Sequence, residues 1–451
     1  MPGSLVGVCS PTPERRLHNH LDDGLPPSRI PKALREFFET AASGGLALLA
    51  ATVVALVWVN SPLSDSYHRL WATELSLRLG SFAIEEDLRH WVNDALMAIF
   101  FFVVGLEIKR ELVAGELRSW RQASLPIVAA IGGMVVPAVL FVAINLGSEG
   151  SAGWGIPMAT DIAFALGVAA LLGKRVPTGL KLFLLTLAIV DDIGAILVIA
   201  VFYSSNVEPR ALLVAGVLLG AMGILRKLQV YWMPPYVVLG SLVWLAVFES
   251  GVHATIAGVV LGLLAPARPL TPAYVAREWA ESLSDDPTPA EARQMTTLAR
   301  TTSSVAERLE LALHPFSSFL IVPVFALANA GVVFDAAALG VPGARRVALG
   351  VGVGLVVGKL LGVTLGAVAA VRLRVAELPP GVSWRHIMGA AGLAGIGFTV
   401  SLFITDLAFV DADLQAASKI GILAASLVAS LVGVVFILAA RSEQHATRAA
   451  D

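Results

Sequence analysis

Long apolar segments alternate with short polar connections along most of the chain, which is the pattern of helices that cross a lipid bilayer. A helix needs about 20 mostly apolar residues to cross the hydrocarbon core, and twelve segments meet this requirement. Because lipid-exposed backbone must satisfy its own hydrogen bonds, we expect these segments to be helical. The expected spans are residues 41–60, 89–112, 123–146, 157–173, 179–203, 209–225, 233–249, 252–267, 314–334, 347–371, 386–410 and 415–440.

The composition supports this interpretation. Hydrophobic residues make up 56% of the 451 residues, charged residues only 15%, and the mean hydropathy is +0.77. Soluble proteins carry about 25% charged residues, so part of this surface must meet lipid in place of water. The sequence therefore predicts an all-α polytopic membrane protein.

Two stretches between the spans have other patterns. Residues 71–84 alternate apolar and polar side chains around Gly80, which predicts a small β-hairpin whose edge can pair with a second copy. Residues 267–313 contain four prolines and several charges, which predicts a partly disordered cytoplasmic loop. We expect a polar tail at 1–36, one membrane domain at 37–440 and a C-terminal tail at 441–451.

Charge and cysteine content exclude several kinds of function. The 32 basic and 34 acidic residues give a net charge of -2, which provides no field for a nucleic-acid partner. Cys9 is the single cysteine, so a disulfide framework, a zinc cluster and an iron–sulfur site all lack ligands. We predict no cofactor.

Basic residues predict the orientation, because Lys and Arg in short loops stay on the cytoplasmic side. With the N-terminus inside, Lys109, Arg110, Lys174 and Arg175 fall in cytoplasmic loops, and the outer loop from 146 to 157 has no Lys or Arg. This arrangement predicts that both termini are cytoplasmic. The exceptions on the outer side are Arg69, Arg78, Arg89, Arg210, Arg345 and Arg346.

Among the ionisable side chains within the expected spans, four stand out as a candidate site. Asp161 follows Thr160 in the fourth span, Asp191 and Asp192 are adjacent in the fifth, and Lys359 is about midway along the tenth. Each buried charge costs roughly 2.5–3.5 kcal/mol on the insertion scale. A cost of this size makes a functional site the first hypothesis.

Each of these residues also has a purely structural interpretation. Asp161 could cap a broken helix, since a carboxylate is stabilised at a helix N-terminus. Lys359 could simply neutralise a carboxylate or helix C-terminal ends. It cannot easily neutralise both Asp191 and Asp192, because adjacent helix positions diverge by about 100°.

A second interrupted segment lies in the span 386–410, where four glycines precede Phe398-Thr399. If spans 3 to 5 and 10 to 12 are equivalent halves, this segment is the counterpart of the one that holds Thr160-Asp161. Paired interrupted segments indicate a midplane site in transporters with repeats. The alternative is ordinary packing of small residues between helices.

Several of these motifs strongly resemble the NhaA family of bacterial sodium/proton antiporters, and the resemblance covers about residues 35 to 440. It implies inverted repeats, with two broken helices that cross, at spans 4 and 11. The motifs are Pro157-Met158-Ala159-Thr160-Asp161-Ile162-Ala163-Phe164-Ala165, Leu187-Ala188-Ile189-Val190-Asp191-Asp192-Ile193-Gly194-Ala195, Gly251-Val252-His253-Ala254-Thr255, Ala391-Gly392-Leu393-Ala394-Gly395-Ile396-Gly397-Phe398-Thr399, Gly105-Leu106-Glu107-Ile108-Lys109-Arg110-Glu111-Leu112, Leu313-His314-Pro315 and Phe325-Ala326-Leu327-Ala328-Asn329-Ala330-Gly331-Val332.

The resemblance assigns roles to the buried charges. Asp191 and Asp192 would carry the ion and the protons, and Thr160 and Asp161 would belong to the helix crossing, where Asp161 compensates helix-end dipoles. Lys359 would pair with Asp191. Sodium, a hard cation, is expected to bind oxygen atoms of Asp191, Asp192 and Thr160, by analogy with other hard cations.

The resemblance also implies a pH-responsive region at the cytoplasmic end. The alternative is a solvated cluster of charges beside the membrane. Glu307 stands where the resemblance leads us to expect a second basic residue beside Arg308. The pH at which transport would be activated is therefore not predicted. The candidate residues are Glu107, Arg110, Glu111, Arg308, Glu310 and His314.

The predicted function is therefore secondary, electrogenic exchange of Na⁺ or Li⁺ for H⁺ by alternating access, in the bacterial inner membrane. The protein would be a transporter and not an enzyme, would export sodium for pH and sodium homeostasis, and would form a homodimer through the hairpin. Burial disfavours the charged form of a carboxylate, so protons can compete with sodium. The main alternative is a proton-coupled symporter of a small organic solute. An intramembrane aspartyl protease would need carboxylates on facing helices, whereas Asp191 and Asp192 are neighbours on one helix.

Overall fold

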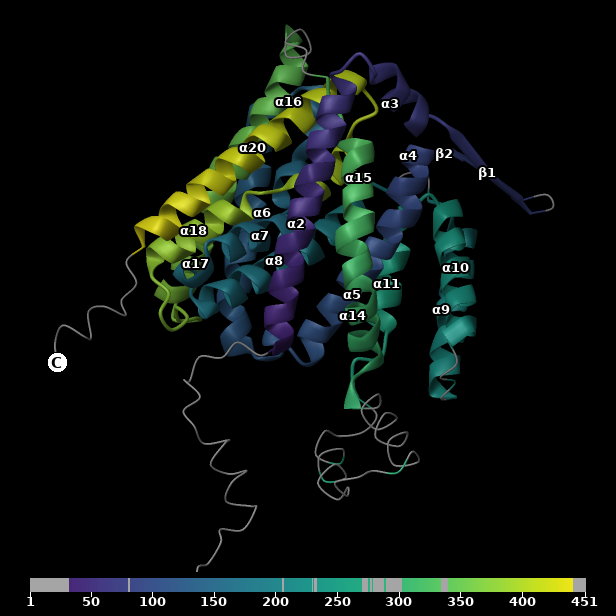
Figure 1. Cartoon of the computed structure of the whole chain (residues 1–451), viewed down its shortest axis with the longest axis horizontal. Helices are drawn as coiled ribbons and strands as arrows, with labels where there is room; N and C mark the ends of the chain where they lie inside the picture. Colours follow the sequence, from purple (N-terminus) through teal and green to yellow (C-terminus); the bar gives the residue numbers. More distant parts are fainter. Residues whose placement is uncertain are drawn as a thin grey trace, which may run out of the picture.

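Helices account for almost all of the residues that the structure describes (Figure 1). The computed structural model describes residues 32–440, except 80–81, 205–206, 229, 231–232, 270–274, 276–277, 279–287, 289–301 and 334–339. The elements before the first break are α2 (Lys32–Val59), α3 (Ser64–Trp71), β1 (Glu74–Leu79), β2 (Phe82–Asp87), α4 (Leu88–Trp91), η1 (Val92–Leu96), α5 (Met97–Val113), η2 (Glu116–Arg118), α6 (Trp120–Asn145) and η3 (Glu149–Met158). They are followed by α7 (Ile162–Leu171), η4 (Gly173–Arg175), α8 (Thr178–Phe202), α9 (Pro209–Lys227), α10 (Met233–Glu249), α11 (Thr255–Leu264), α14 (Val305–Phe316), η5 (Ser317–Ile321), α15 (Val322–Asn329), α16 (Pro342–Val353), η7 (Gly354–Gly358), α17 (Lys359–Arg372), α18 (Trp384–Ala394), α19 (Phe398–Ala408) and α20 (Ala412–Ala439).

The described residues supply a helical segment for every expected span. Seven helices are long and apolar enough to cross a membrane, three further segments are bent helix pairs, and α10 and α11 are shorter apolar helices. Two of the bent pairs are η3 with α7, at 45°, and α18 with α19, at 43°. The prediction of an all-helical polytopic membrane protein with two broken helices is confirmed.

The fourth span begins earlier than expected. The sequence interpretation placed a loop at 146–157 and opened the span at Pro157, whereas residues Glu149–Met158 form the first half of the broken helix. Gly150, Gly153 and Gly155 lower the apolar content of this half, and Gly153 has non-helical dihedral angles. The break therefore lies within the span, at Ala159, Thr160 and Asp161, instead of near its start.

The ninth span also begins earlier than its expected start at residue 314. Ser304 accepts a hydrogen bond from the backbone N–H of Glu307 and caps α14 at Val305. The last nine residues of the predicted loop 267–313 are consequently helical, while most of that loop, like the tails 1–31 and 441–451, lies outside the described residues.

The predicted hairpin is present, with shifted boundaries. β1 and β2 pair antiparallel, with Glu74 opposite Asp87 and Leu77 opposite Ile84. Trp71 ends helix α3 and does not belong to the hairpin. Asp87 ends β2 and accepts a hydrogen bond from the backbone N–H of His90, so the hairpin joins the next helix through a capping side chain.

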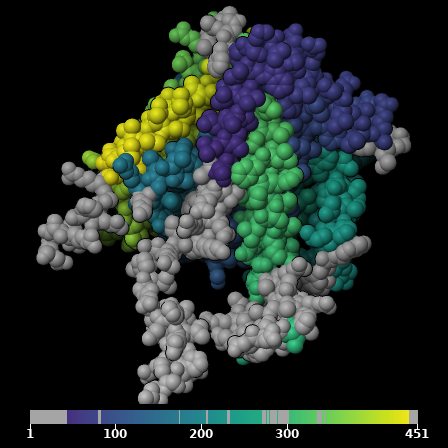
Figure 2. All heavy atoms as spheres, viewed as in Figure 1, coloured from purple at the N-terminus to yellow at the C-terminus, as the bar shows by residue number. Residues whose placement is uncertain are grey.

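Close helix contacts at glycines form the centre of the bundle. A Cβ atom on Gly132 of α6 or on Gly362 of α17 would overlap backbone of the facing helix, so these helices pack backbone to backbone. Figure 2 shows α2 in purple beside the green surface of α14 and α15 on one face. We refer below to the end of the bundle that carries α3 and the hairpin, at the top of Figure 1, as the hairpin end.

Candidate functional site

The two helix breaks meet inside the bundle. The backbone N–H of Asp161, in the break between η3 and α7, donates to the carbonyl oxygen of Ile396, in the break between α18 and α19, at 2.6 Å. The Thr160 hydroxyl Oγ1 lies 2.8 Å from the carbonyl oxygen of Ala394. Chain segments more than 230 residues apart are thus joined at their unwound residues.

Asp161 caps both half-helices that begin at the crossing. Its Oδ1 accepts from the backbone N–H of Phe164, in the first turn of α7, at 3.0 Å. Its Oδ2 accepts from the backbone N–H and the hydroxyl of Thr399, in the first turn of α19, at 3.1 and 2.8 Å. One carboxylate therefore compensates two positive helix ends, because each N-terminus attracts an anion. The same side chain therefore caps the helix, as its structural interpretation expected, and lies at two helix N-termini, as the family resemblance implied.

Lys359 pairs with Asp191 and not with Asp192. Its Nζ lies 2.5 Å from Asp191 Oδ2 and 3.1 Å from Thr160 Oγ1, and Thr160 Oγ1 lies 2.7 Å from the same carboxylate oxygen. The side chains of Lys359 and Asp191 have no solvent exposure. A buried ion pair is tolerated when geometry and further hydrogen bonds compensate for desolvation, and the Thr160 hydroxyl supplies such a bond.

A local change of helix geometry positions Lys359. The residue begins α17 directly after the π-helical turn Gly354–Gly358, and such turns are frequent at functional sites. Gly133 of α6 lies opposite, where a Cβ atom would be 3.8 Å from Lys359 Cδ and would overlap Val363. The absence of a side chain at Gly133 leaves room for Val363, one turn after Lys359, and so allows α17 to pack closely against α6.

Asp192 faces a cavity that Asp191 does not line. Asp192, Thr160, Asp161 and Thr399 line a cavity of about 60 Å³, room for a few water molecules. Within the described part of the chain, Oδ1 of Asp192 and Oδ1 of Asp191 are buried without a hydrogen-bond partner. Buried unpartnered oxygens are costly, and the binding of a cation or the uptake of protons would lower this cost.

The cavity extends away from the hairpin end. Its further lining includes Gly44 of α2, Glu107 of α5 and His314 of α14. Glu107 and His314 belong to the predicted pH-responsive set, and their closest oxygen and nitrogen are 3.9 Å apart. The candidate ion site and part of this set therefore share one cavity.

The remaining candidates of that set divide into two groups. Arg110 contacts Glu310 and also donates to Glu111 at 3.2 Å, so these three charges form a cluster that joins α5 to α14. Arg308 is exposed, like Glu307 beside it, and the described residues give its side chain no ion pair. The structure brings together five of the six candidates and leaves Arg308 at the surface.

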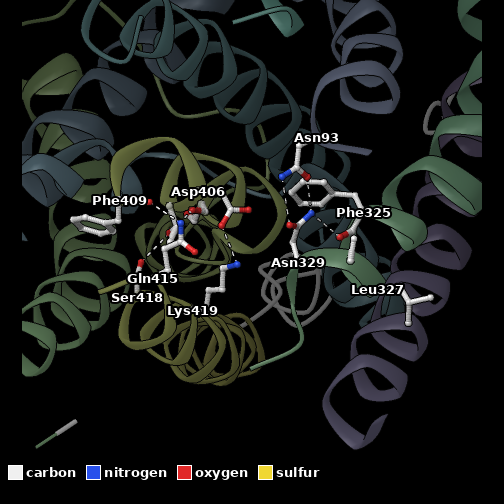
Figure 3. A network of polar contacts seen from close by, with 12 residues as sticks. Asn93, Phe325, Leu327, Asn329, Asp406, Phe409, Gln415, Ser418 and Lys419 are labelled. Carbon is white, nitrogen blue, oxygen red and sulfur yellow. Dashed lines mark hydrogen bonds and ion pairs between the residues drawn. The ribbon is translucent and has the colours of Figure 1, made fainter. Parts of the chain in front are cut away.

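A second, partly buried ion pair was not predicted from the sequence. Asp406, near the end of α19, lies 2.9 Å from the ammonium of Lys419 in α20. Figure 3 shows this pair in one view with Asn93 and Asn329, whose side chains are hydrogen-bonded to each other. Both charges lie inside expected spans, and a charge in a span is itself a signal of a site. The hydrogen bonds from Thr399 to Asp161 were also not predicted, although the motif that contains Thr399 was identified.

A polytopic helical fold in which two broken helices cross is typical of one class of protein, the secondary transporters. Residues 35–437 match the Na⁺/H⁺ antiporter 1 family. The chain belongs to this family, and it is a transporter that exchanges sodium ions for protons and not an enzyme.

Relatives match along almost the whole chain. It is 49% identical to the Na(+)/H(+) antiporter NhaA 3 of Frankia alni over 91% of this chain and 89% of the relative. It is 46% identical to the Na(+)/H(+) antiporter NhaA of Rhodopirellula baltica, over 93% and 98% respectively. The NhaA antiporter of Oleidesulfovibrio alaskensis is 47% identical, over 92% and 96%. The resemblance drawn from the motifs is confirmed.

Proposed function

We propose that Asp191 and Asp192 are the sites at which sodium and protons compete, and that Thr160 contributes a further oxygen ligand. The observation that carries this proposal is the pair of buried, unpartnered Oδ1 atoms on adjacent carboxylates. Oxygen atoms suit a hard cation such as sodium. A sodium ion can bind to these carboxylate oxygens, and so can a proton. The binding of one therefore displaces the other.

Lys359 and Asp161 have different roles in this proposal. Lys359 holds one carboxylate, Asp191, in a neutral pair while the site lacks sodium, and it is displaced when the cation binds. Asp161 keeps the two half-helices together at the crossing. The interactions that support these roles are the Lys359 contacts with Asp191 and Thr160 and the double cap on Asp161.

The transport cycle in this proposal starts from the position of the cavity. In this conformation the cavity beside Asp192 lies toward the end that carries Glu107 and His314, and ions reach Asp192 from that end. Alternating access requires a second conformation that opens to the hairpin end, in which the exchange partner binds.

We propose that the hairpin end faces the outside of a bacterial inner membrane and that both termini face the cytoplasm, because the positions of the Lys and Arg residues in the loops favour that orientation. Sodium then leaves the cell as protons enter, and lithium follows the same path. This exchange contributes to pH and sodium homeostasis.

The cluster of Arg110, Glu111 and Glu310, with Glu107 and His314 in the cavity, is our candidate for the pH response. These groups lie between the site and the cytoplasmic end. A change of charge there alters the field at Asp192. We retain Arg308 as a weaker candidate, because it acts from the surface.

The proposed exchange is tested in everted membrane vesicles with a preset pH gradient. Sodium addition collapses the gradient with the wild type, whereas Asp192→Asn abolishes the response at every pH because the site loses a carboxylate. The matched control is Asp413→Asn, the same substitution at an exposed position, which keeps the wild-type response.

Two results would contradict the proposal. If the inserted Asp192→Asn variant still collapsed the gradient at the wild-type rate, Asp192 would not carry the exchange. If the wild type responded to a small organic solute and to neither sodium nor lithium, the protein would be a proton-coupled symporter.

We further propose that the protein forms a homodimer through the hairpin. The hairpin stands out from the bundle in Figure 1, and among the described strands each of the two has one edge without a partner strand. Such an edge can pair with an identical copy.

A further inference from the structure

A groove runs along the membrane-facing surface between α16 and α20, on the side of the molecule away from the hairpin (Figure 1). Its floor contains small residues, among them Gly352 of α16 and Gly421 and Ala424 of α20. Larger side chains flank it, and Leu349 and Val428 are 51% and 44% exposed. Because this surface belongs to membrane-spanning helices, lipid is the medium that contacts the groove.

The groove has the length of one lipid leaflet. Along α16 and η7 it extends from Arg345 to Val356, which is about 16 Å at a rise of 1.5 Å per residue. Half of a hydrocarbon core of about 30 Å is nearly the same length. An acyl chain that runs parallel to the helices from the membrane surface would therefore occupy the whole groove.

The charged end of the groove favours one class of lipid. Arg345 lies at the hairpin end, in the first turn of α16, and is exposed. A guanidinium presents several N–H donors in a fixed fork that matches phosphate oxygens. The positive end of the α16 helix dipole adds to the positive potential at this point.

We propose that this groove binds a phospholipid with an anionic headgroup, with the phosphate at Arg345 and one acyl chain along Gly352, Gly421 and Ala424. The site is separate from the ion site and does not depend on the transport mechanism. It also lies away from the proposed dimer contact, so a dimer and a bound lipid are compatible.

Native mass spectrometry of the full-length protein, titrated with phosphatidylglycerol or with phosphatidylcholine of identical acyl chains, tests the proposal. The wild type holds one phosphatidylglycerol more tightly than any phosphatidylcholine. Arg345→Ala reduces this preference about fivefold, the effect expected for one basic residue near an anionic headgroup. Arg346→Ala is the matched control, since Arg346 is an exposed arginine next in sequence that does not line the groove, and it changes the preference less than twofold.

A second variant tests the acyl chain. A Cβ atom on Gly352 meets no atom within 4 Å, so Gly352→Leu fills the groove without disturbing the packing. It weakens the tightest adduct of both lipids, while thermal unfolding stays unchanged. Equal losses in Arg345→Ala and Arg346→Ala would overturn the proposal, as would a tight adduct that survives both Arg345→Ala and Gly352→Leu.

Discussion

Asp191 and Asp192 are neighbours in sequence but lie in different surroundings. Adjacent helix positions diverge by about 100°, and α8 uses this difference to direct Asp191 toward Lys359 and Asp192 toward the cavity. Both carboxylates are buried. Asp191 pairs with a cation of the protein, whereas Oδ1 of Asp192 has no partner among the described residues. Our proposal that sodium and protons compete at Asp192 rests on this difference.

Removal of Lys359 alone is expected to destabilise the protein strongly. Lys359→Met leaves the Asp191 carboxylate buried without its partner, and breaking a buried pair in this way costs about 3–5 kcal/mol. The double variant Lys359→Met/Asp191→Leu recovers most of this loss, because no uncompensated charge remains. Thermal unfolding of the purified proteins in detergent measures both effects.

The ion pair of Asp406 and Lys419 provides a control for the stability loss of Lys359→Met. Lys419→Met removes the partner of Asp406, whose side chain is partly exposed, so its loss of stability is smaller than that of Lys359→Met. Equal stabilities of Lys359→Met and the wild type would show that the Asp191 pair contributes nothing to the fold.

At the scale of elements, close contact between α6 and α17 holds the helix of Lys359 in place. A Cβ atom on Gly362 would overlap the carbonyl oxygen of Gly132. Because two backbones in contact cannot shift independently, even one methyl group separates the helices.

We therefore expect opposite effects from two Gly→Ala substitutions. Gly362→Ala lowers stability by about 1–3 kcal/mol, the usual effect of an inserted group in a packed core, and weakens sodium-dependent exchange because Lys359 moves. Gly216→Ala in α9, where a Cβ atom meets open space, raises helix stability by about 0.5–1 kcal/mol. Thermal unfolding and vesicle transport report on both variants, and a stable, fully active Gly362→Ala protein would rule out the tight contact.

Much of this arrangement was predictable from local sequence. Twenty-residue apolar segments predict the spans, and glycines beside Thr160-Asp161 and before Phe398 predict the two breaks. Distant pairing is different, because no local pattern states that Asp161 receives hydrogen bonds from Thr399, 238 residues further on. The early start of the fourth span could not be predicted for a different reason. Its glycines lower the apolar content of residues 149–158, but they do not prevent these residues from forming a 3-10 helix.

At the scale of the whole molecule, the hairpin is the element least supported by the bundle. Leu75 and Leu77 lie two residues apart on β1, on the same face of the hairpin, and are 45% and 54% exposed. A second copy of the hairpin would cover them.

Deletion of residues 75–86, with Glu74 joined to Asp87 through a short Gly-Ser linker, is expected to lower the dimer fraction. Glu74 and Asp87 are paired neighbours, so the linker spans a short gap and the Asp87 cap is kept. Mass photometry in detergent measures the dimer fraction, and vesicle transport confirms that the monomer is folded. An unchanged dimer fraction in an active protein would place the contact elsewhere.

Net charge movement is the corresponding prediction for transport. If Asp192 takes up one proton when sodium leaves, and the Lys359 amine takes up another as it pairs again with Asp191, two protons cross for each sodium and each cycle moves one charge. We expect a sodium-dependent current in a voltage-clamped membrane, which Asp192→Asn removes and Asp413→Asn retains. Exchange at the wild-type rate without any current would indicate one proton per sodium.

The shared cap on Asp161 has a mechanical consequence. Its carboxylate accepts hydrogen bonds from the first turns of both α7 and α19. A tilt of either half-helix therefore acts on the other through only two consecutive hydrogen bonds. A motion that exposes the site to one face is thereby transmitted to the half-helix that closes the opposite face. The same carboxylate that balances helix-end charge would thus work as a linkage that keeps both faces from opening at once.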